Sequence, residues 1–381
     1  MLDNVIRVVG EKRMIKLKPD NKVTAKGNVL ISYITAPFRQ KTEDGWPTSH
    51  SNYWECFQMA RTYLDFGYAV DIIDWTDNRF LPKKDYDVFI DIHSNMERLA
   101  PFLHDECLKI LHITGAHWLF QNHAEYARLI ALQQRRGISL VPHRIVPPSL
   151  GIEYADCATI VGNQFAINTF AYTNKPIHRI PVSSSVTFPW IAGKDFDACR
   201  RTYLWIGSSG LVHKGLDLVL EAFIDLKDCE LHICGPVQDE TDFVKAYSKE
   251  LYSTANIKNH GWIDVASPEF SALTGRCAAV VYPSCSEGTA GSVITCLHAG
   301  LIPIVSRESG VDIGDFGFLL RNNTTDDIKK MIHGVAELST DELRARSKKA
   351  WEFAQANHTR EEFAKAYRQF VAKLLDIQGK G

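Results

Sequence analysis

Short apolar runs alternate with helical patterns along the chain from Val29 onward. After the first of these runs, Trp54, Phe57 and Tyr63 recur near helical spacing, and Gly67 follows as a stop signal. Strands that alternate with helices predict a parallel sheet with covering helices. In the first half of the chain, we predict strands at 29–35, 68–74, 86–93, 108–116 and 157–162.

The alternation stops around 181–200, where Ser, Pro and Gly gather and periodicity is lost. We interpret this stretch as an interdomain linker, which we place at 184–200. A second alternating series follows, and the last forty residues have a helical pattern. The strands predicted in this second series lie at 202–208, 229–236, 256–263, 278–284 and 301–306.

These patterns predict an α/β protein with two Rossmann-like domains. We expect an N-terminal domain at 1–183, a C-terminal domain at 201–359, and a C-terminal helix at 360–381 that packs back on the first domain. The carboxyl ends of both sheets would then face one cleft, which is where ligands of such sheets bind. The length of 381 residues suits two domains rather than one core.

The charge balance limits the choice of partner. A net charge of -2 gives no reason to expect nucleic acid. The first 26 residues hold seven Lys/Arg against three acidic residues. This local excess of positive charge predicts a solvated leader, with weak contact to an anionic membrane surface as the alternative.

Targeting and cysteine patterns favour a cytoplasmic protein. If the basic N-terminal stretch contacts a membrane, we expect the contact at the inner face. The chain has no run of 18 apolar residues, and its N-terminus lacks the pattern of a signal peptide. Nine cysteines are scattered without zinc-site spacing, which predicts reduced core thiols. We expect no metal and no other cofactor.

Two strand–loop–helix units carry candidate chemistry. In the first, Lys214 precedes a helix whose positive end it opposes, which makes sense if both share an anion. The alternative is a lysine that points to water. In the second, Gly288 and Gly291 let the backbone approach a ligand, and Ser292 is placed to cap a helix.

Glu287 stands beside this second anion site. A carboxylate repels phosphate, so its natural partner is a neutral, hydroxyl-rich group next to the phosphate. A sugar diphosphate fits this combination. The alternative is that Glu287 caps a local turn.

The order of these residues resembles glycosyltransferase family 4, a family of retaining enzymes with the GT-B fold. The resemblance covers nearly all of 202–306 and is weaker but collinear at 112–118 and 155–165. The residues that carry it are Gly207, Lys214-Gly215-Leu216-Asp217, Glu221-Ala222-Phe223, Ile233-Cys234-Gly235, Gly261, Pro283-Ser284, Glu287-Gly288, Gly300 and Pro303-Ile304-Val305.

The resemblance implies transfer of a sugar from a nucleotide-sugar donor to a glycan or lipid-linked acceptor, in polysaccharide or glycoconjugate biosynthesis. Glu287 would hold donor-sugar hydroxyls, Lys214 would neutralise the diphosphate, and His117 would lie at the reaction centre. The expected donor contacts are Gly207, Ser208, Ser209, Gly235, Gly261, Trp262, Ile263, Gly288, Thr289, Ala290, Gly291, Ser292 and Thr295.

Two departures from the family pattern bear on catalysis. Ser208 and Ser209 stand where the family usually carries an arginine, and Thr295 stands where its second glutamate holds the nucleotide ribose. Loss of a charged hydrogen bond is worth about 1.5–3 kcal/mol. Arg307, His213 or a residue of the N-terminal domain could supply the missing cation. The alternatives are a non-catalytic nucleotide-sugar or glycan-binding protein, or a sugar-nucleotide epimerase of the same fold.

Polar residues of the N-terminal domain are candidates for the acceptor side. His50, Ser51 and Asn52 start a predicted helix, where they contact acceptor or diphosphate or simply cap the helix. Asn122 and Glu125 follow His117 and would line the acceptor site, and His93 ends another predicted strand. Asp85–Asp87 matches a metal-binding Asp-x-Asp, but it directly precedes an apolar strand, so we interpret it as a polar strand start.

Overall fold

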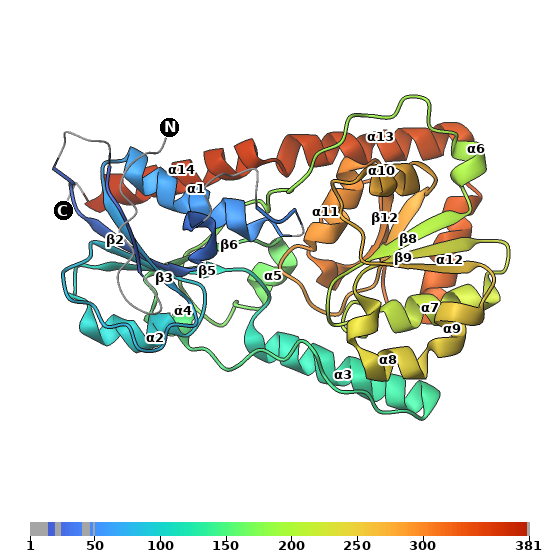
Figure 1. The fold of residues 1–381 in the computed structure, drawn as a ribbon, viewed down its shortest axis with the longest axis horizontal. Helices are drawn as coiled ribbons and strands as arrows, with labels where there is room; N and C mark the ends of the chain where they lie inside the picture. Colours follow the sequence, from blue (N-terminus) through green and yellow to red (C-terminus); the bar gives the residue numbers. More distant parts are fainter. Residues whose placement is uncertain (1–13, 20–23, 40–45, 49, 379–381) are drawn as a thin grey trace.

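The computed structural model describes residues 14–19, 24–39, 46–48 and 50–378 (Figure 1). They form two α/β domains, each built on a mainly parallel sheet with helices on its faces. The prediction of two Rossmann-like domains that face a central cleft is confirmed. Residues 1–13 and 20–23 of the basic N-terminal stretch lie outside the described residues.

The first sheet has the strand order β1-β3-β2-β4-β5-β6-β7. Its interior strands are buried on both faces, as their continuous apolar runs predict. The sheet is not wholly parallel, because β1 pairs antiparallel with β3 through Ile15 and Ile72. Its strands are β1 Ile15–Leu17, β2 Asn28–Tyr33, β3 Ala69–Asp74, β4 Val88–Asp91, β5 Leu108–Ile113, β6 Cys157–Ile160 and β7 Ile177–Arg179. Edge strands β1 and β7 were not predicted, because three residues carry too short a pattern.

The second sheet has the order β10-β9-β8-β11-β12-β13, and all its neighbours pair in parallel. The order reverses between β8 and β11, so the loops that follow these two strands lie side by side at the switch point. Its strands are β8 Thr202–Ile206, β9 Glu230–Cys234, β10 Ile257–Gly261, β11 Ala279–Tyr282, β12 Ile302–Ser306 and β13 Phe318–Leu320.

The C-terminal helix α14 (Arg360–Gln378) returns to the first domain and lies along α1 (Asn52–Asp65), as Figure 1 shows. Phe363 packs edge-on against Trp54, with ring centroids 5.7 Å apart, and Tyr367 packs against Tyr63. Both rings from α14 belong to the apolar core of the first domain. The last helix therefore packs back on the first domain.

Helix α3 (Trp118–Arg136) crosses from the first domain to the second (Figure 1). Its Leu132 is buried in the core of the second domain. Arg135 forms an ion pair of 2.8 Å with Asp217, and Arg128 donates to the Pro283 carbonyl at 3.0 Å. Although α3 lies in the first half of the sequence, much of its packing is with the second domain.

The remaining helices cover the two sheets, and the chain from 181 to 195 has no regular structure. In the part of the chain that the structure describes, no helix is both long and apolar enough to cross a membrane. The remaining helices, which cover the sheets, have the following bounds: α2 Asn95–Leu99, α4 Gly151–Tyr154, α5 Gln164–Asn168, α6 Phe196–Cys199, α7 Leu216–Asp225, α8 Thr241–Ala246, α9 Ser248–Ser253, α10 Pro268–Gly275, α11 Gly291–His298, α12 Thr325–Ala336 and α13 Thr340–Asn357.

Candidate functional site

The loops after β8 and β11 meet and bring Lys214 to Glu287. The Cys285 N–H donates to the His213 carbonyl at 2.9 Å, which joins the two loops. Gly215 has a φ of +74°, and a Cβ there would lie 2.6 Å from the Pro283 carbonyl oxygen. Only glycine allows this close approach. As a result, Lys214 Nζ lies 3.0 Å from Glu287 Oε1.

The Glu287 carboxylate is held by several neighbours. Its Oε1 accepts hydrogen bonds from Lys214, from the Tyr282 hydroxyl at 3.0 Å and from the Ser284 hydroxyl at 3.2 Å. Burial alone raises its pKa, but the charges of Lys214, His213 and Arg144 outweigh burial and lower the pKa to about 2. The carboxylate is therefore ionised and fixed in position at neutral pH.

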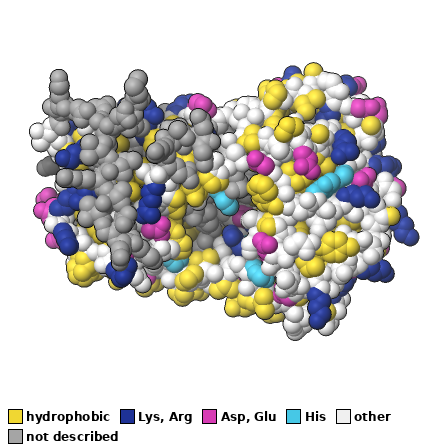
Figure 2. Space-filling view, in the orientation of Figure 1, with side chains coloured by type: hydrophobic (Ala, Val, Ile, Leu, Met, Phe, Trp, Pro, Cys, Tyr) yellow, Lys and Arg dark blue, Asp and Glu magenta, His cyan; other side chains and the backbone are white. Residues whose placement is uncertain are grey.

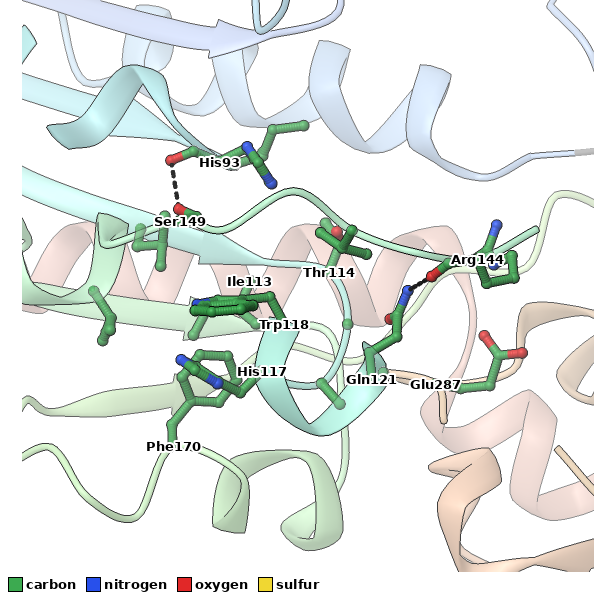
Figure 3. A pocket seen from close by; sticks show the side chains of 17 residues that line it. His93, Ile113, Thr114, His117, Trp118, Gln121, Arg144, Ser149, Phe170 and Glu287 are labelled. Atoms are coloured by element: carbon green, nitrogen blue, oxygen red, sulfur yellow. Dashed lines mark hydrogen bonds between the residues drawn. The ribbon is translucent and has the colours of Figure 1, made fainter. Parts of the chain in front are cut away.

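A cavity of about 210 Å³ lies between the two domains (Figure 3). Thr114, His117 and Arg144 line it from the first domain, and Glu287 and Gly288 line it from the second. The space-filling view shows the surface hollowed between the domains, with histidine, basic and acidic side chains at the rim (Figure 2). The cavity thus lies at the carboxyl ends of both sheets, where the cleft was predicted.

Gly288 is the point where the second domain touches the backbone of the first. A Cβ at this position would lie 2.5 Å from the Val161 carbonyl oxygen and 2.7 Å from that of Thr114. Both are backbone atoms at the ends of strands, so they have little freedom to move aside. The absence of a side chain at 288 therefore permits this close contact between the domains.

Replacement of Gly288 by alanine is expected to lower the free energy of unfolding by about 1–3 kcal/mol, because overpacking strains a contact that cannot relax. Thermal unfolding measures this loss, and limited proteolysis reports whether the cleft opens. Gly193→Ala is the control, since a Cβ there meets nothing within 4 Å. Equal stability of the two variants would contradict the assignment of Gly288 to the domain contact.

Glycines at the ends of three neighbouring strands form the floor of the predicted donor site. The Gly207 N–H donates to the Cys234 carbonyl at 3.0 Å, and the Gly235 N–H donates to that of Gly261 at 2.7 Å. Ser208 and Ser209 in the same region are exposed. Beyond this edge Trp262 is 60% exposed, so its ring is accessible to a base, whereas Ile263 is buried.

The prediction that Ser292 caps helix α11 is wrong. The helix begins at Gly291, its N-cap is Ala290, and no side chain caps it. The Ala290 N–H donates to the Ser309 carbonyl at 2.9 Å and is not available to an anion. Ser292 lies within the first turn, because the chain turns into the helix two residues earlier than its hydroxyl suggested.

Two threonines of the predicted donor site bond to the protein itself. The Thr289 hydroxyl donates to the Gly310 carbonyl at 3.3 Å. The Thr295 hydroxyl donates to the Gly291 carbonyl at 3.1 Å, one turn back in the same helix. Thr295 therefore has no proton to offer a ribose in this arrangement, and contact with the nucleotide stays a prediction for both residues.

His117 caps helix α3 and does not end a strand. Its Nδ1 accepts from the Leu119 N–H at 3.3 Å, and its Nε2 lies 3.2 Å from the Tyr172 hydroxyl, which donates to Glu153. Burial lowers the pKa of His117, which is consistent with a neutral ring. Both ring nitrogens are occupied, so the ring lines the cavity without a free polar atom.

His93 lines the same cavity from the end of β4 (Figure 3). Its Nδ1 is buried and has no hydrogen-bond partner among the described residues. A buried, unpaired ring nitrogen at a cavity is what a ligand hydroxyl would satisfy. The structure therefore favours His93 over His117 as the histidine that contacts a ligand, although its sequence signal was the weaker one.

The four residues predicted for the acceptor side have different surroundings in the structure. The Asn122 side-chain amide forms hydrogen bonds with the backbone N–H and carbonyl of Val146, both at 2.9 Å. Its polar atoms therefore fix the backbone at Val146 and do not point into the cavity as free groups. Ser51 is the N-cap residue of α1 but makes no capping hydrogen bond, and Asn52 Oδ1 is buried without a partner among the described residues. Much of the surface of His50 is exposed, but partial burial, Lys214 and Arg144 all lower its pKa, so it lies near these cations.

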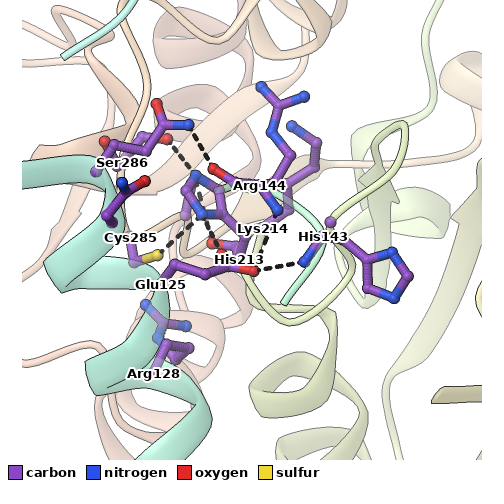
Figure 4. Close-up of polar contacts among 12 residues, drawn as sticks. Glu125, Arg128, His143, Arg144, His213, Lys214, Cys285 and Ser286 are labelled. Atoms are coloured by element: carbon purple, nitrogen blue, oxygen red, sulfur yellow. Dashed lines mark hydrogen bonds and ion pairs between the residues drawn. The ribbon is translucent and has the colours of Figure 1, made fainter. Parts of the chain in front are cut away.

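Glu125 joins the two domains and is not among the residues that line the cavity (Figure 4). Its Oε2 lies 2.6 Å from His213 Nδ1, and its Oε1 accepts from the His143 N–H at 2.9 Å. Burial alone lowers the pKa of His213, but hydrogen bonds with Cys285 and Glu125 raise it to about 9. The pair is therefore a buried imidazolium and carboxylate at neutral pH.

Glu125, His213 and Cys285 also form the only group of possible metal ligands found among the described residues, with ligand atoms within 4.8 Å of one another. The short contact between Glu125 and His213 is that of a charged hydrogen bond. A metal would have to displace the proton that this contact shares. The ion pair accounts for the cluster without a metal.

The chain resembles known proteins in part of its sequence and in its fold. Residues 200–341 match the family model described as glycosyl transferases group 1. No curated protein matches the chain. Sucrose-phosphate synthase from Thermosynechococcus elongatus matches with a TM-score of 0.63 and 15% identity, over 92% of this chain and 99% of that protein.

A glycosyltransferase from Rickettsia africae matches with a TM-score of 0.61 and 12% identity, and Anabaena HepE, solved with UDP and glucose, matches with 0.56 and 12%. Each match covers 92% of this chain and 99% of the other protein. The chain spans about half the length of TarM, which matches with a TM-score of 0.50 and 15% identity, over 53% of that protein. The fold is GT-B, as the resemblance implied.

Proposed function

We propose that this chain, whose residues 200–341 form a glycosyl transferases group 1 domain within a GT-B fold, transfers a sugar from a nucleotide-sugar donor to a glycan or lipid-linked acceptor. One observation carries the proposal. Lys214 and Glu287 lie 3.0 Å apart at the domain cleft, one suited to a phosphate and the other to the hydroxyls of a sugar. The neighbour solved with UDP and glucose supports a donor of this class.

In the proposed mechanism the configuration at the anomeric carbon is retained. Lys214 neutralises the diphosphate while the bond between the anomeric carbon and the phosphate oxygen breaks. The acceptor oxygen forms its bond to that carbon from the same face and passes its proton to the departing phosphate. Glu287 holds the donor hydroxyls, and no metal is required, because protein cations balance the charge of the leaving group.

The proposal also includes the setting in which the protein works. All nine cysteines are free and buried, which suits a reducing compartment such as the cytoplasm. A contact of the basic N-terminal stretch with the inner face of a membrane stays a prediction, since most of its charged residues lie outside the described part.

A donor panel tests the proposal. Incubation with UDP-, GDP-, ADP- and CMP-sugars, with and without a chelator, is expected to show slow nucleotide release from one class of donor. The rate should not depend on the chelator, since the proposed mechanism uses no metal. A donor that binds without turnover would instead favour a non-catalytic sugar-nucleotide-binding protein. That alternative is supported by the serines at 208 and 209 and by the engaged hydroxyl of Thr295.

A further inference from the structure

We propose that Arg144, from the first domain, supplies the second cation on the departing diphosphate. It would replace the arginine that the loop after β8 lacks. The inference rests on the proposed function and assigns a residue to it that the sequence pattern of the family does not contain.

The side chain of Arg144 lies across the loop that carries serines in place of arginine. A Cβ on Gly210 would collide with Cγ of Arg144 and lie 2.8 Å from its Cδ. Gly210 also has a φ of +90°, a conformation that favours glycine. Ser208 and Ser209, two and one residues earlier, are exposed. Arg144 therefore fills the space above the loop from the opposite domain.

The guanidinium of Arg144 lies near a group of charges in which Arg144 and Lys214 share one carboxylate, Glu287. Arg144 and Lys214 both act on Glu287 and both lower the pKa of His50. Two other nearby carboxylates are already engaged, Glu125 with His213 and Glu240 with backbone N–H groups of the loop after β8. Glu287 already pairs with Lys214. Like charges that share one carboxylate favour a bound anion, and guanidinium is suited to phosphate because it can form two parallel hydrogen bonds.

Arg144 itself is uncommitted. Its guanidinium makes no ion pair and no hydrogen bond with the residues that the structure describes, and its Nε is buried without a partner. The residue lines the cavity together with Glu287 and Gly288 (Figure 3). Since a buried donor without a partner is costly, a ligand oxygen at this point would satisfy it.

The backbone of Arg144 is fixed to helix α3, which contacts both domains. Its N–H donates to Glu125 at 3.3 Å, and its carbonyl accepts from Gln121 at 2.7 Å. Glu125 in turn pairs with His213 in the loop after β8 (Figure 4). The backbone that carries the guanidinium is thus fixed before a ligand arrives, which favours electrostatic catalysis.

The other candidate cations are committed elsewhere. Arg307 is exposed, and its guanidinium lies over the Phe165 ring at 5.5 Å from the centroid. His213 is buried against Glu125. Among the cations considered for the missing position, Arg144 alone combines a free guanidinium with a place on the cavity wall.

The test compares Arg144→Gln, Arg144→Lys and the double variant Arg144→Gln/Ser208→Arg. Titration with UDP, GDP and ADP measures affinity for the diphosphate, and nucleotide release from the donor measures kcat. Arg144→Gln is expected to lower kcat by about 10²-fold or more and to weaken diphosphate binding by about tenfold, with little change in the thermal midpoint. Arg144→Lys should keep part of the activity, because it keeps the charge.

Ser208→Arg should restore at least about tenfold of the lost kcat, since it places a guanidinium at the position the family uses. A purely structural role for Arg144 would not be rescued in this way. Arg61→Gln, at an exposed position on α1, is the matched control and should behave as the unchanged protein.

The outcomes separate the two proposals. If the unchanged protein releases nucleotide but Arg144→Gln keeps kcat and diphosphate affinity within about twofold, the assignment of Arg144 is wrong and the proposed function stands. Loss of activity in Arg144→Gln without rescue by Ser208→Arg also overturns the assignment. If the unchanged protein neither binds a nucleoside diphosphate nor releases one, both proposals fail.

Discussion

Replacement of Glu287 by alanine is expected to lower kcat for nucleotide release by about 10³-fold, the largest effect on activity that we predict. The carboxylate is the fixed negative group at the cleft, and donor-sugar hydroxyls are its natural partners. Removal of the carboxylate also leaves Lys214 without its ion pair, although this side chain is only 6% exposed. Steady-state kinetics with the donor found in the panel measures the effect.

Glu287→Gln is the matched control for charge. It keeps the shape of the side chain and an oxygen that can accept from Tyr282 and Ser284. Its kcat is expected to fall between those of the alanine variant and the unchanged protein, because neutral hydrogen bonds to sugar hydroxyls are weaker than charged ones. An alanine variant with near-normal kcat and a normal thermal midpoint would remove Glu287 from the proposed mechanism.

The largest effect on stability is expected for Glu125→Ala, at about 3–5 kcal/mol, because the substitution leaves His213 buried without its counter-charge. Both side chains are at most 3% exposed, so solvent screens the pair very little. Urea and thermal unfolding measure the loss. Glu106→Ala, at an exposed position, should change stability by less than about 0.5 kcal/mol.

The same pair predicts how stability depends on pH. His213 has a pKa of about 9 in the folded protein, above its ordinary value of 6.5. Its contribution is therefore complete below pH 6.5 and is lost as the pH rises through 9. The pKa of Glu125 lies below its ordinary value of 4.5, so the contribution of Glu125 is complete above that pH.

The stability difference between the unchanged protein and Glu125→Ala should be largest between about pH 4.5 and 6.5 and should shrink by pH 9.5. Thermal midpoints measured across this range test the prediction. A difference that stays constant across the whole range would contradict a charged pair and favour a neutral hydrogen bond.

Much of the fold could be predicted because its signals are local. Ten strands were predicted within a few residues of where they lie, since apolar runs between glycine-rich turns report burial directly. The loops of Lys214 and Glu287 were identified in the same way, and the structure brings these two residues together. Short edge strands were missed because three residues of a strand have no distinctive period.

The roles of individual polar residues were harder to predict. Ser292 and His117 have side chains that suit several roles, and the position of each helix start decided between them. Glu125 was predicted to line an acceptor site, but it pairs with a histidine 88 residues away. Such long-range partners leave no trace in local spacing.

The sequence by itself determined the two domains, the cleft between them and the loops that carry Lys214 and Glu287, because strand periods and glycine positions act over a few residues. The tertiary structure alone decided that α3 packs on the second domain and that Arg144 lies across Gly210. Charge pairing and packing depend on distance in space, which the order of residues along the chain does not contain. For this reason, the absence of an arginine beside Gly207 did not exclude a second cation at the cleft.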